Sequence, residues 1–330
     1  GCGPGRQSTV VAAAVASARW TCSAVGEERE IDRDEYTPGV EPRPTWCPGC
    51  GAFGVLKARR QALPEVGRTP EGTLRCTGIG CSGKLNSYLD TYGFHTIHGR
   101  SLPVARAAKL ANPGVEVIAA GGDGDGYGIG GNHFIHTARE NHDMTYIVFN
   151  NEIFGLTKGQ TSPTSPKGHK SKTQPHGSAK EPLKPLSMAL NAGASYVART
   201  AAVNPNQAKE ILIEAIEHDG FAHVDFLTQC PTWNKDAKQY VPYKDVNEDD
   251  EFDFDPTDRA EAQEMMRETE EKLYDGEVLT GVYYREDDRP SYQQEKQAIG
   301  EIPEEPLAER YFDDDYEWER SADLFLDSHK

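Results

Sequence analysis

Short apolar runs alternate with longer amphipathic segments along the middle of the chain. The runs predict buried strands at 74–77, 115–120, 144–149, 195–198 and 222–227. The segments between them predict helices at 82–92, 103–111, 129–140, 186–191 and 205–218. In the last helix, Ile211, Ala215 and Ile216 share one side. Helices between successive strands favour parallel pairing with both faces covered, so we predict an α/β fold with a doubly wound, mostly parallel sheet.

The pattern divides the chain into three parts. Residues 1–40 predict a weakly ordered N-terminal arm, residues 41–243 the α/β domain, and residues 244–330 an acidic C-terminal extension. Within the extension we expect a charged helix at 257–274 and a short strand at 278–284. We interpret the extension as a subunit contact, with this strand as the candidate contact segment. Two alternatives stay open: a partly disordered solvating tail, and a strand folded back on its own domain.

The charge of the chain limits its partners. It has 330 residues and a formal net charge of -18, and more than half of its Asp and Glu residues lie beyond Tyr243. Such a surface repels nucleic acid and anionic membranes, so we expect neither as a partner. The acidity suits a halophilic protein that stays hydrated in high salt, and it equally suits an ordinary acidic enzyme.

Hydropathy and cysteine usage bear on the compartment. No apolar run approaches the ~20 residues that a membrane helix needs. Residues 10–16 faintly resemble the apolar part of a signal peptide, but the run is short and rich in alanine. The seven cysteines are an odd number and do not suggest a disulfide framework. We therefore expect a cytoplasmic protein.

Glycine and polar residues directly follow four of the predicted strands. These clusters lie at 78–81, 122–125, 150–151 and 229–231. The carboxyl ends of parallel strands meet at one edge of an open sheet, which is where ligands bind. Packing alone does not readily account for four such clusters, and they predict one ligand site at this edge.

The Gly-Asp-Gly-Asp segment at 122–125 suggests a metal-bridged phosphate. Its glycines let the backbone approach a phosphate near the start of a helix. A bare carboxylate at Asp123 would repel that phosphate, and a Mg²⁺ ion between them removes the conflict. Asn151 and the backbone carbonyl of Ile153 are candidates for the second and third oxygen ligands. The structural alternative is a glycine-rich turn closed by an Asx cap.

A dinucleotide-binding fingerprint overlaps this segment. Gly126, Gly128 and Gly131 match G-x-G-x-x-G. That motif requires an acidic residue after the next strand, where this chain has Asn150 and Asn151, and it leaves Asp123 without a role. We therefore favour the metal site.

Four cysteines are candidate ligands of one metal centre. Cys47 and Cys50 form a C-x-x-C loop, and Cys81 and Cys230 each follow a distant strand. Four thiolates suit a [4Fe–4S] cluster or a structural zinc ion. The spacing favours the cluster, because zinc ribbons commonly use two C-x-x-C pairs. Cys76 lies within a predicted strand as a core residue, and we expect no role for the two cysteines of the arm.

The motifs together resemble the β subunit of 2-oxoacid:ferredoxin oxidoreductases. In order they are WCPGCG, GIGCSGK, HGR at 98–100, GGDGD, NNEIFGLTKGQTSPT and QCPTW. The match covers about residues 31–243, and GVYYRE and RPSY in the extension also look like this family. Ala52 departs from the larger residue expected after CPGCG, which does not affect a ligand. The chain before residue 31 has no counterpart in the family.

The resemblance implies a thiamine diphosphate-binding domain with Mg²⁺ and one [4Fe–4S] cluster. The implied metal ligands are Cys47, Cys50, Cys81 and Cys230 for the cluster, and Asp123, Asn151 and the Ile153 carbonyl for Mg²⁺. The implied cofactor contacts are Ile79, Gly80, Cys81, Ser82, Gly122, Gly124, Leu156 and Thr157. The implied catalytic residues are His98 beside the cofactor and Lys84 and Lys158 near the substrate carboxylates.

The implied activity is the oxidative decarboxylation of a 2-oxoacid, either 2-oxoglutarate or pyruvate, with coenzyme A. The products would be acyl-CoA and CO2, and electrons would pass singly through the cluster to ferredoxin. The polar loop at 161–180 carries Lys167, Lys170 and Lys172. It is either an anion-binding segment, for example for coenzyme A, or a plain solvated loop.

One part of a thiamine enzyme has no place in this chain. Such enzymes use a glutamate from a second domain to activate the cofactor, and the resemblance assigns that glutamate to a partner α subunit. We therefore expect the chain to act only in a hetero-oligomer. A different class of function is a non-catalytic scaffold subunit whose four cysteines hold a structural zinc ion.

Overall fold

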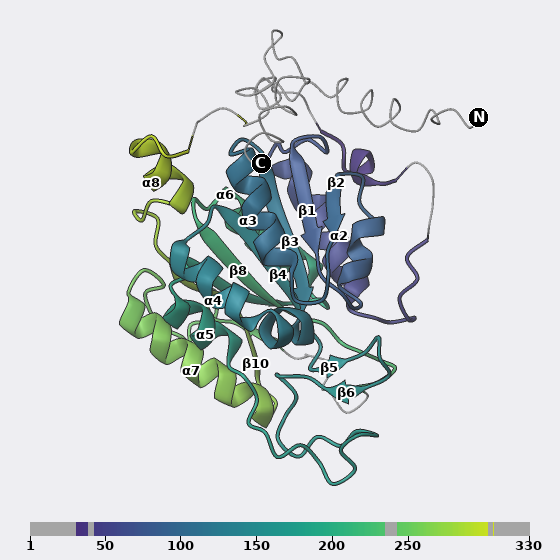
Figure 1. Cartoon of the computed structure of the whole chain (residues 1–330). Helices are drawn as coiled ribbons and strands as arrows, with labels where there is room; N and C mark the ends of the chain where they lie inside the picture. The colour runs from purple at the N-terminus through teal and green to yellow at the C-terminus, as the bar shows by residue number, and fades with distance from the viewer. Residues whose placement is uncertain (1–30, 39–42, 235–242, 303–305, 307–330) are drawn as a thin grey trace, which may run out of the picture.

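One sheet forms the centre of the computed structural model, which describes residues 31–38, 43–234, 243–302 and 306 (Figure 1). Its eight strands lie in the order β2-β1-β3-β4-β8-β7-β10-β9. Their bounds are β1 Thr73–Thr77, β2 Tyr92–His95, β3 Glu116–Gly122, β4 Met144–Asn150, β7 Tyr196–Ala201, β8 Phe221–Leu227, β9 Tyr243–Asp245 and β10 Val278–Arg285. Two further strands, β5 Ile153–Phe154 and β6 Gln160–Thr161, form a separate hairpin.

Six neighbouring strands of the sheet, from β2 to β7, pair in parallel. Strand β10 pairs antiparallel with β7, and the short β9 runs parallel to β10. The chain turns to one side after β1 and to the other side after β3, although these strands are neighbours. The carboxyl ends of β1 and β3 are therefore a topological switch point, where open α/β sheets bind ligands.

Helices cover both faces of the sheet (Figure 1). Their bounds are α2 Ala52–Glu65, α3 Ser101–Ala111, α4 Gly131–Glu140, α5 Pro185–Ala192, α6 Pro205–Glu217, α7 Arg259–Asp275 and α8 Tyr292–Ala298. Helices α2 and α6 pack with one set of strand residues, and α3, α4, α5 and α7 pack with the alternating set. Because side chains point alternately to the two faces of a strand, β3 contributes Ile118 to the first core and Val117 to the second. The doubly wound α/β prediction is confirmed.

The predicted helix at 82–92 is wrong. The segment begins with a short 3-10 helix, η3, at Gly83–Ser87, and the edge strand β2 follows it. Strand β2 has only four residues, all exposed, and the alternation of Tyr92 and Phe94 is too short to signal a half-buried strand. Helices α2 and α8 are present in the structure, although the sequence analysis did not predict them. The other predicted strands and helices are present, with boundaries shifted by a few residues.

The extension contributes to the core of the domain. Strand β10 lies in the central sheet, and Tyr283 and Leu279 are buried in the same core as Met266 of α7. The interpretation of 278–284 as a contact strand for another subunit is therefore wrong, and the fold-back alternative holds. The rest of the predicted tail beyond residue 302 lies, apart from Pro306, outside the described residues.

A small part of the predicted arm is described, at residues 31–38. It contains a short 3-10 helix, η2, at Arg33–Tyr36, capped by Asp32. Tyr36 is fully buried and packs in the same core as α2. Residues 1–30, with Cys2 and Cys22, lie outside the described residues.

Candidate active site

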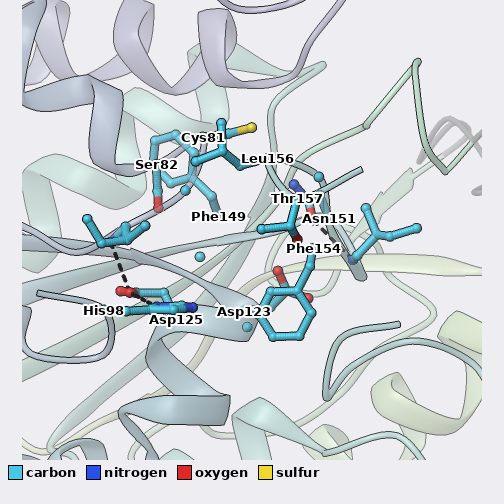
Figure 2. A pocket seen from close by; sticks show the side chains of 16 residues that line it. Cys81, Ser82, His98, Asp123, Asp125, Phe149, Asn151, Phe154, Leu156 and Thr157 are labelled. Atoms are coloured by element: carbon cyan, nitrogen blue, oxygen red, sulfur yellow. Dashed lines mark hydrogen bonds and ion pairs between the residues drawn. The ribbon is translucent and has the colours of Figure 1, made fainter. Parts of the chain in front are cut away.

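A pocket opens at the switch point between β1 and β3 (Figure 2). Its walls come from the loops after β1, β3 and β4 and from the segment before α3. The lining residues are Ile79, Gly80, Cys81, Ser82, His98, Gly122, Asp123, Gly124, Asp125, Phe149, Asn151, Ile153, Phe154, Gly155, Leu156 and Thr157. The structure thus gathers in one pocket the residues that the sequence assigned to the diphosphate, the Mg²⁺ ion and the thiamine.

Asp123 is a buried carboxylate at the base of this pocket. It directly follows β3 and precedes η4, a turn of π-helix at Gly124–Ile129 that continues into α4. Burial raises the pKa of the Asp123 carboxyl to about 6, while hydrogen bonds from Ser162 and Thr164 act in the opposite direction. The Thr164 hydroxyl donates to Asp123 Oδ2 at 2.7 Å. A buried carboxylate of this kind is stabilised in its charged form by a cation, which fits a Mg²⁺ ligand.

Asn151 and Ile153 lie one strand away, where β4 leads into β5. Asn151 Oδ1 accepts a hydrogen bond from the Ile153 N–H at 3.1 Å, which fixes the amide. Glu152 between them has a left-handed backbone, with φ of 59°. Its side chain is buried, and burial raises its pKa to about 8. An aspartate and an asparagine supply the hard oxygen ligands that Mg²⁺ prefers.

Gly124 shapes the pocket wall because glycine has no side chain. A Cβ atom there would lie 2.1 Å from the ring of Phe154. Glycine is therefore required for Phe154 to lie against the backbone at the start of η4. The N–H groups of a helix N-terminus suit a diphosphate, so the glycine pattern and the oxygen donors fit the same ligand.

Asp125 organises the other side of the pocket, and the sequence analysis missed it. Its Oδ1 accepts hydrogen bonds from the Ile79 and Gly99 N–H groups at 3.0 and 2.8 Å. His98 Nδ1 lies 2.6 Å from the same oxygen (Figure 2). One buried carboxylate thus joins the loops after β1 and β2. The second aspartate of the GDGD segment was the available signal.

Three of the four candidate cluster cysteines lie outside the lining of this pocket but near it. A Cβ at Gly155 would lie 3.6 Å from Cys230 Sγ and 3.8 Å from Cys81 Sγ, so both thiols face this glycine. The pKa of Cys50 is raised to about 11, mainly by burial and in smaller part by Cys81, Cys230 and Cys47. All four thiols are therefore close enough to interact electrostatically.

The number and type of these thiols bear on the kind of metal centre that they could hold. In the described part of the chain, no three His, Cys, Asp or Glu side chains come close enough to hold one metal ion. A [4Fe–4S] cluster spreads its four cysteine ligands over a cube of iron and sulfur atoms. The four thiols fit such a cluster by their number and type. Cys76, by contrast, is fully buried within β1, as predicted for a core residue.

Two contacts tie the C-x-x-C loop to the loop that carries Cys81. Trp46 Nε1 donates to the Cys81 carbonyl at 2.8 Å, and Lys84 Nζ donates to the Thr45 carbonyl at 3.2 Å. Lys84 therefore lies on the thiol side, and it is absent from the pocket lining. Lys158 is exposed, has a left-handed backbone with φ of 79°, and does not line the pocket either.

No helix within the described ranges combines the length and the apolar character that a membrane crossing requires.

Residues 78–226 match the family model "Thiamine pyrophosphate enzyme, C-terminal TPP binding domain". The fold and the pocket thus define the diphosphate-binding domain of a thiamine diphosphate enzyme.

Comparisons with individual proteins narrow the family. The chain is 38% identical over 260 residues to a 2-oxoacid:ferredoxin oxidoreductase subunit beta from Sulfolobus sp, covering 77% of this chain and 85% of that protein. It is 45% identical over 200 residues to the 2-oxoglutarate oxidoreductase subunit KorB of Mycobacterium tuberculosis, covering 61% and 53%. The chain belongs to the β subunits of the 2-oxoacid:ferredoxin oxidoreductases.

A solved structure extends this likeness over most of the fold. It is a 2-oxoglutarate:ferredoxin oxidoreductase from Magnetococcus marinus with 2-oxoglutarate, coenzyme A and succinyl-CoA bound. The TM-score is 0.77 at 36% sequence identity, and the match covers 92% of this chain and 99% of that chain.

Proposed function

We propose that this β subunit oxidatively decarboxylates a 2-oxoacid with coenzyme A, giving acyl-CoA and CO2, and passes electrons singly to ferredoxin. The observation that carries the proposal is the position of Cys81. It lines the pocket that suits thiamine diphosphate and also lies close enough to Cys47, Cys50 and Cys230 to interact with them electrostatically. One short loop therefore joins a cofactor pocket to a one-electron centre.

The oxygen ligands would hold the cofactor through Mg²⁺. Asp123, Asn151 and the Ile153 carbonyl would bind the ion, and Gly122, Gly124 and the loop from Ile79 to Ser82, which line the same pocket, would surround the diphosphate. Leu156 and Thr157 close the pocket on the side of β5. Bound thiamine diphosphate supplies the electron sink for decarboxylation, which protein side chains lack. The protein positions this group and limits its contact with water.

His98 is the candidate proton-transfer group. Its ring lies edge-on to Phe154, with 6.2 Å between the ring centroids, and Asp125 fixes its Nδ1 atom. A carboxylate at Nδ1 sets the tautomer and leaves Nε2 for exchange with a bound group. Because 38% of the side chain is exposed, His98 is accessible from the pocket.

Cys47, Cys50, Cys81 and Cys230 would hold a [4Fe–4S] cluster. Such a cluster would supply one-electron transfer, which a ferredoxin partner requires. The alternative, a scaffold subunit with structural zinc, is disfavoured because such zinc sites commonly use two C-x-x-C pairs, and here Cys81 and Cys230 come singly from distant segments. It is also disfavoured because the oxygen-lined pocket would then have no role.

An α-type partner is the proposed source of the missing glutamate. Large apolar side chains near the pocket are exposed: Leu156 by 51%, Ile97 by 78% and Ile129 by 55%. Ile97 precedes His98, and Ile129 lies against Gly99, so this apolar surface adjoins the pocket. A partner that covered it would also shield the cofactor from water. The tail strand first considered for this role is buried within the sheet.

The names of relatives and the composition of the chain bear on the substrate and the conditions. Relatives named for 2-oxoglutarate and the solved structure with 2-oxoglutarate bound favour that acid over pyruvate. The free thiols at the site suit a cytoplasmic location, because oxidation would remove cluster ligands. The charge of -18 suits activity in high salt, where repulsion between subunits is screened.

The test is reconstitution with an α-type subunit. The chain is purified alone and co-expressed with that partner, and each sample is assayed for ferredoxin reduction with 2-oxoglutarate and with pyruvate. Activity with either acid only in the assembled complex, and rising with salt, supports the proposal. Full activity of the lone chain would overturn the two-subunit assignment. An assembled complex that holds zinc and oxidises neither acid would establish the scaffold instead.

A further inference from the structure

The start of the polar loop after β6 is buried against the metal-site carboxylate. Thr164 is 1% exposed, and its hydroxyl contacts both Asp123 Oδ2 at 2.7 Å and Asn150 Oδ1 at 2.9 Å. Ser165 Oγ accepts from the Ser162 N–H at 2.8 Å and donates to the Glu152 carbonyl. The segment 162–165 therefore contacts both loops that carry the proposed Mg²⁺ ligands.

The Thr164 hydroxyl is itself held from the sheet. Asn150 Nδ2 donates to Asp225 Oδ1 at 3.1 Å, so the amide oxygen of Asn150 faces Thr164. Asp225 is fixed in turn by Arg199 Nε at 2.8 Å. The single hydroxyl proton then has two acceptors, and the charged carboxylate is the stronger one. A buried chain of hydrogen bonds thus reaches from Arg199 to Asp123.

A second support comes from the acidic extension. Tyr274, near the end of α7, donates its hydroxyl to the backbone carbonyl of Thr164 at 3.2 Å. Tyr274 is far from Thr164 in the sequence. Its contact nevertheless brings the extension to a residue that bonds directly to the Asp123 carboxylate. Helix α7 thereby holds the backbone of the segment that orients Asp123.

We propose that Thr164 is a positioning residue that orients Asp123 for the Mg²⁺ ion, and that Tyr274 of α7 holds Thr164 in place. The inference rests on the proposed function, because it takes Asp123 as a ligand of the Mg²⁺ that binds thiamine diphosphate. Groups that hydrogen-bond to metal ligands commonly change metal affinity by about 10- to 100-fold when they are removed.

The experiment measures the Mg²⁺ concentration at which the assembled complex binds thiamine diphosphate. Bound cofactor and metal are removed with a chelator, the cofactor is added at a fixed concentration, and binding is followed by calorimetry during Mg²⁺ titration. Thr164→Val removes the hydroxyl at nearly constant shape, and Thr164→Ser retains it. We expect Thr164→Val to need about 10- to 100-fold more Mg²⁺ and Thr164→Ser to stay near the wild-type value.

Matched controls separate positioning from loss of stability. Thr145→Val removes another buried threonine hydroxyl, on strand β4. This hydroxyl donates a hydrogen bond to the Ala215 carbonyl of α6. Tyr196→Phe removes a buried tyrosine hydroxyl near the Ile211 carbonyl, away from the pocket. Neither control should change the Mg²⁺ requirement, whereas Tyr274→Phe should raise it by a few-fold.

The outcomes distinguish this proposal from the one on which it rests. An unchanged Mg²⁺ requirement in Thr164→Val, or an equal loss in Thr164→Ser, would overturn the role of the hydroxyl. If Thr164→Val does not assemble, Tyr274→Phe carries the test, and a response no larger than that of Tyr196→Phe would overturn the proposal. A wild-type complex without Mg²⁺-dependent cofactor binding would instead refute the proposed function.

Discussion

Two buried carboxylates stand at opposite ends of β3 and are stabilised in different ways. Glu116, where the strand begins, lies 3.3 Å from the guanidinium of Arg68. Asp123, just beyond the other end, accepts a hydroxyl hydrogen bond from Thr164. Burial raises both pKa values, to about 7 for Glu116 and about 6 for Asp123. At one end the protein supplies its own cation, and at the other it supplies oxygen ligands that suit an external one.

The difference shows how to separate a structural carboxylate from a functional one. Both residues are almost fully buried, so burial alone does not distinguish them. Asp123 lies at the carboxyl edge of the sheet among glycines and a second oxygen ligand, while Glu116 lies at the opposite edge between basic residues. The surroundings of each carboxylate, and not its pKa, therefore indicate its role.

The largest predicted effect separates the two ends directly. Asp123→Ala should abolish retention of thiamine diphosphate, because the diphosphate loses its metal bridge, and should leave the fold intact. Glu116→Gln is the matched variant at the other end of the strand and should retain the cofactor. Cofactor content of the purified complexes measures both. Undiminished cofactor in Asp123→Ala would refute the metal site.

The thiols beside the Asp123 end give the second prediction. Serine keeps the size of cysteine but is a poor ligand for iron, so Cys47→Ser, Cys50→Ser, Cys81→Ser and Cys230→Ser should each reduce iron and acid-labile sulfide strongly. Cys76→Ser is the control, since Cys76 is buried inside β1. If Cys230→Ser kept full iron and a wild-type visible spectrum, the fourth ligand would be wrongly assigned.

These two sites were the most predictable part of the molecule. The proposed oxygen ligands, Cys81 and Cys230 closely follow strands, so a parallel sheet places them at one edge, and the C-x-x-C motif marks Cys47 and Cys50 as their partners. Asp125 was missed because its partners are backbone N–H groups of two other loops, which no local pattern reveals. Thr164 was missed for the same reason, since it contacts Asp123 from 41 residues away.

The extension was harder to predict from composition. More than half of the acidic residues lie beyond Tyr243, which suggested a solvated or subunit-contact tail. The apolar positions of α7, Ala262, Met265 and Met266, form a narrow stripe within a charged helix. Strand β10 pairs with β7, which lies some 80 residues earlier in the sequence. Local periodicity therefore could not predict the place of β10 in the sheet.

The third prediction concerns Lys84 and Lys158. It tests whether the site at the Asp123 end of β3 reaches either lysine when substrate binds. We predict that Lys84 or Lys158 pairs with a substrate carboxylate, although neither lines the pocket. Loss of such a charge contact should cost about 2–5 kcal/mol in kcat/KM. The lysine variants Lys84→Ala and Lys158→Ala are compared with Lys209→Ala, whose ammonium pairs with Glu65 far from the pocket. If Lys84→Ala and Lys158→Ala both kept the wild-type kcat/KM, other groups would bind the substrate carboxylate.

The smallest effect concerns stability at the Glu116 end. The folded-state pKa of about 7 lies above the ordinary value of 4.5, so between these values the folded chain binds more protons than the unfolded chain. Stability should therefore fall as pH rises from about 4.5 to about 7, by at most about 3 kcal/mol. Glu116→Gln should make this fall smaller by the share that Glu116 contributes, as measured by denaturant unfolding across that pH range, while the raised pKa values of Asp123 and Glu152 leave a remaining fall of the same sign.

The control for this pH effect is Glu65→Gln, which removes an exposed ion pair with Lys209. That pair should contribute little, and the variant should follow the wild-type pH dependence. A pH dependence in Glu116→Gln equal to that of the wild type would mean that Arg68 and Lys109 already keep Glu116 charged at low pH.

The most direct test is the visible spectrum of the assembled complex before and after addition of a 2-oxoacid without oxygen or ferredoxin. If the pocket at Asp123 and the thiols around Gly155 form one electron path, the complex shows iron–sulfur absorption, and 2-oxoglutarate or pyruvate bleaches it. A spectrum without iron–sulfur absorption, or one that neither acid changes in a complex loaded with thiamine diphosphate, would contradict the account.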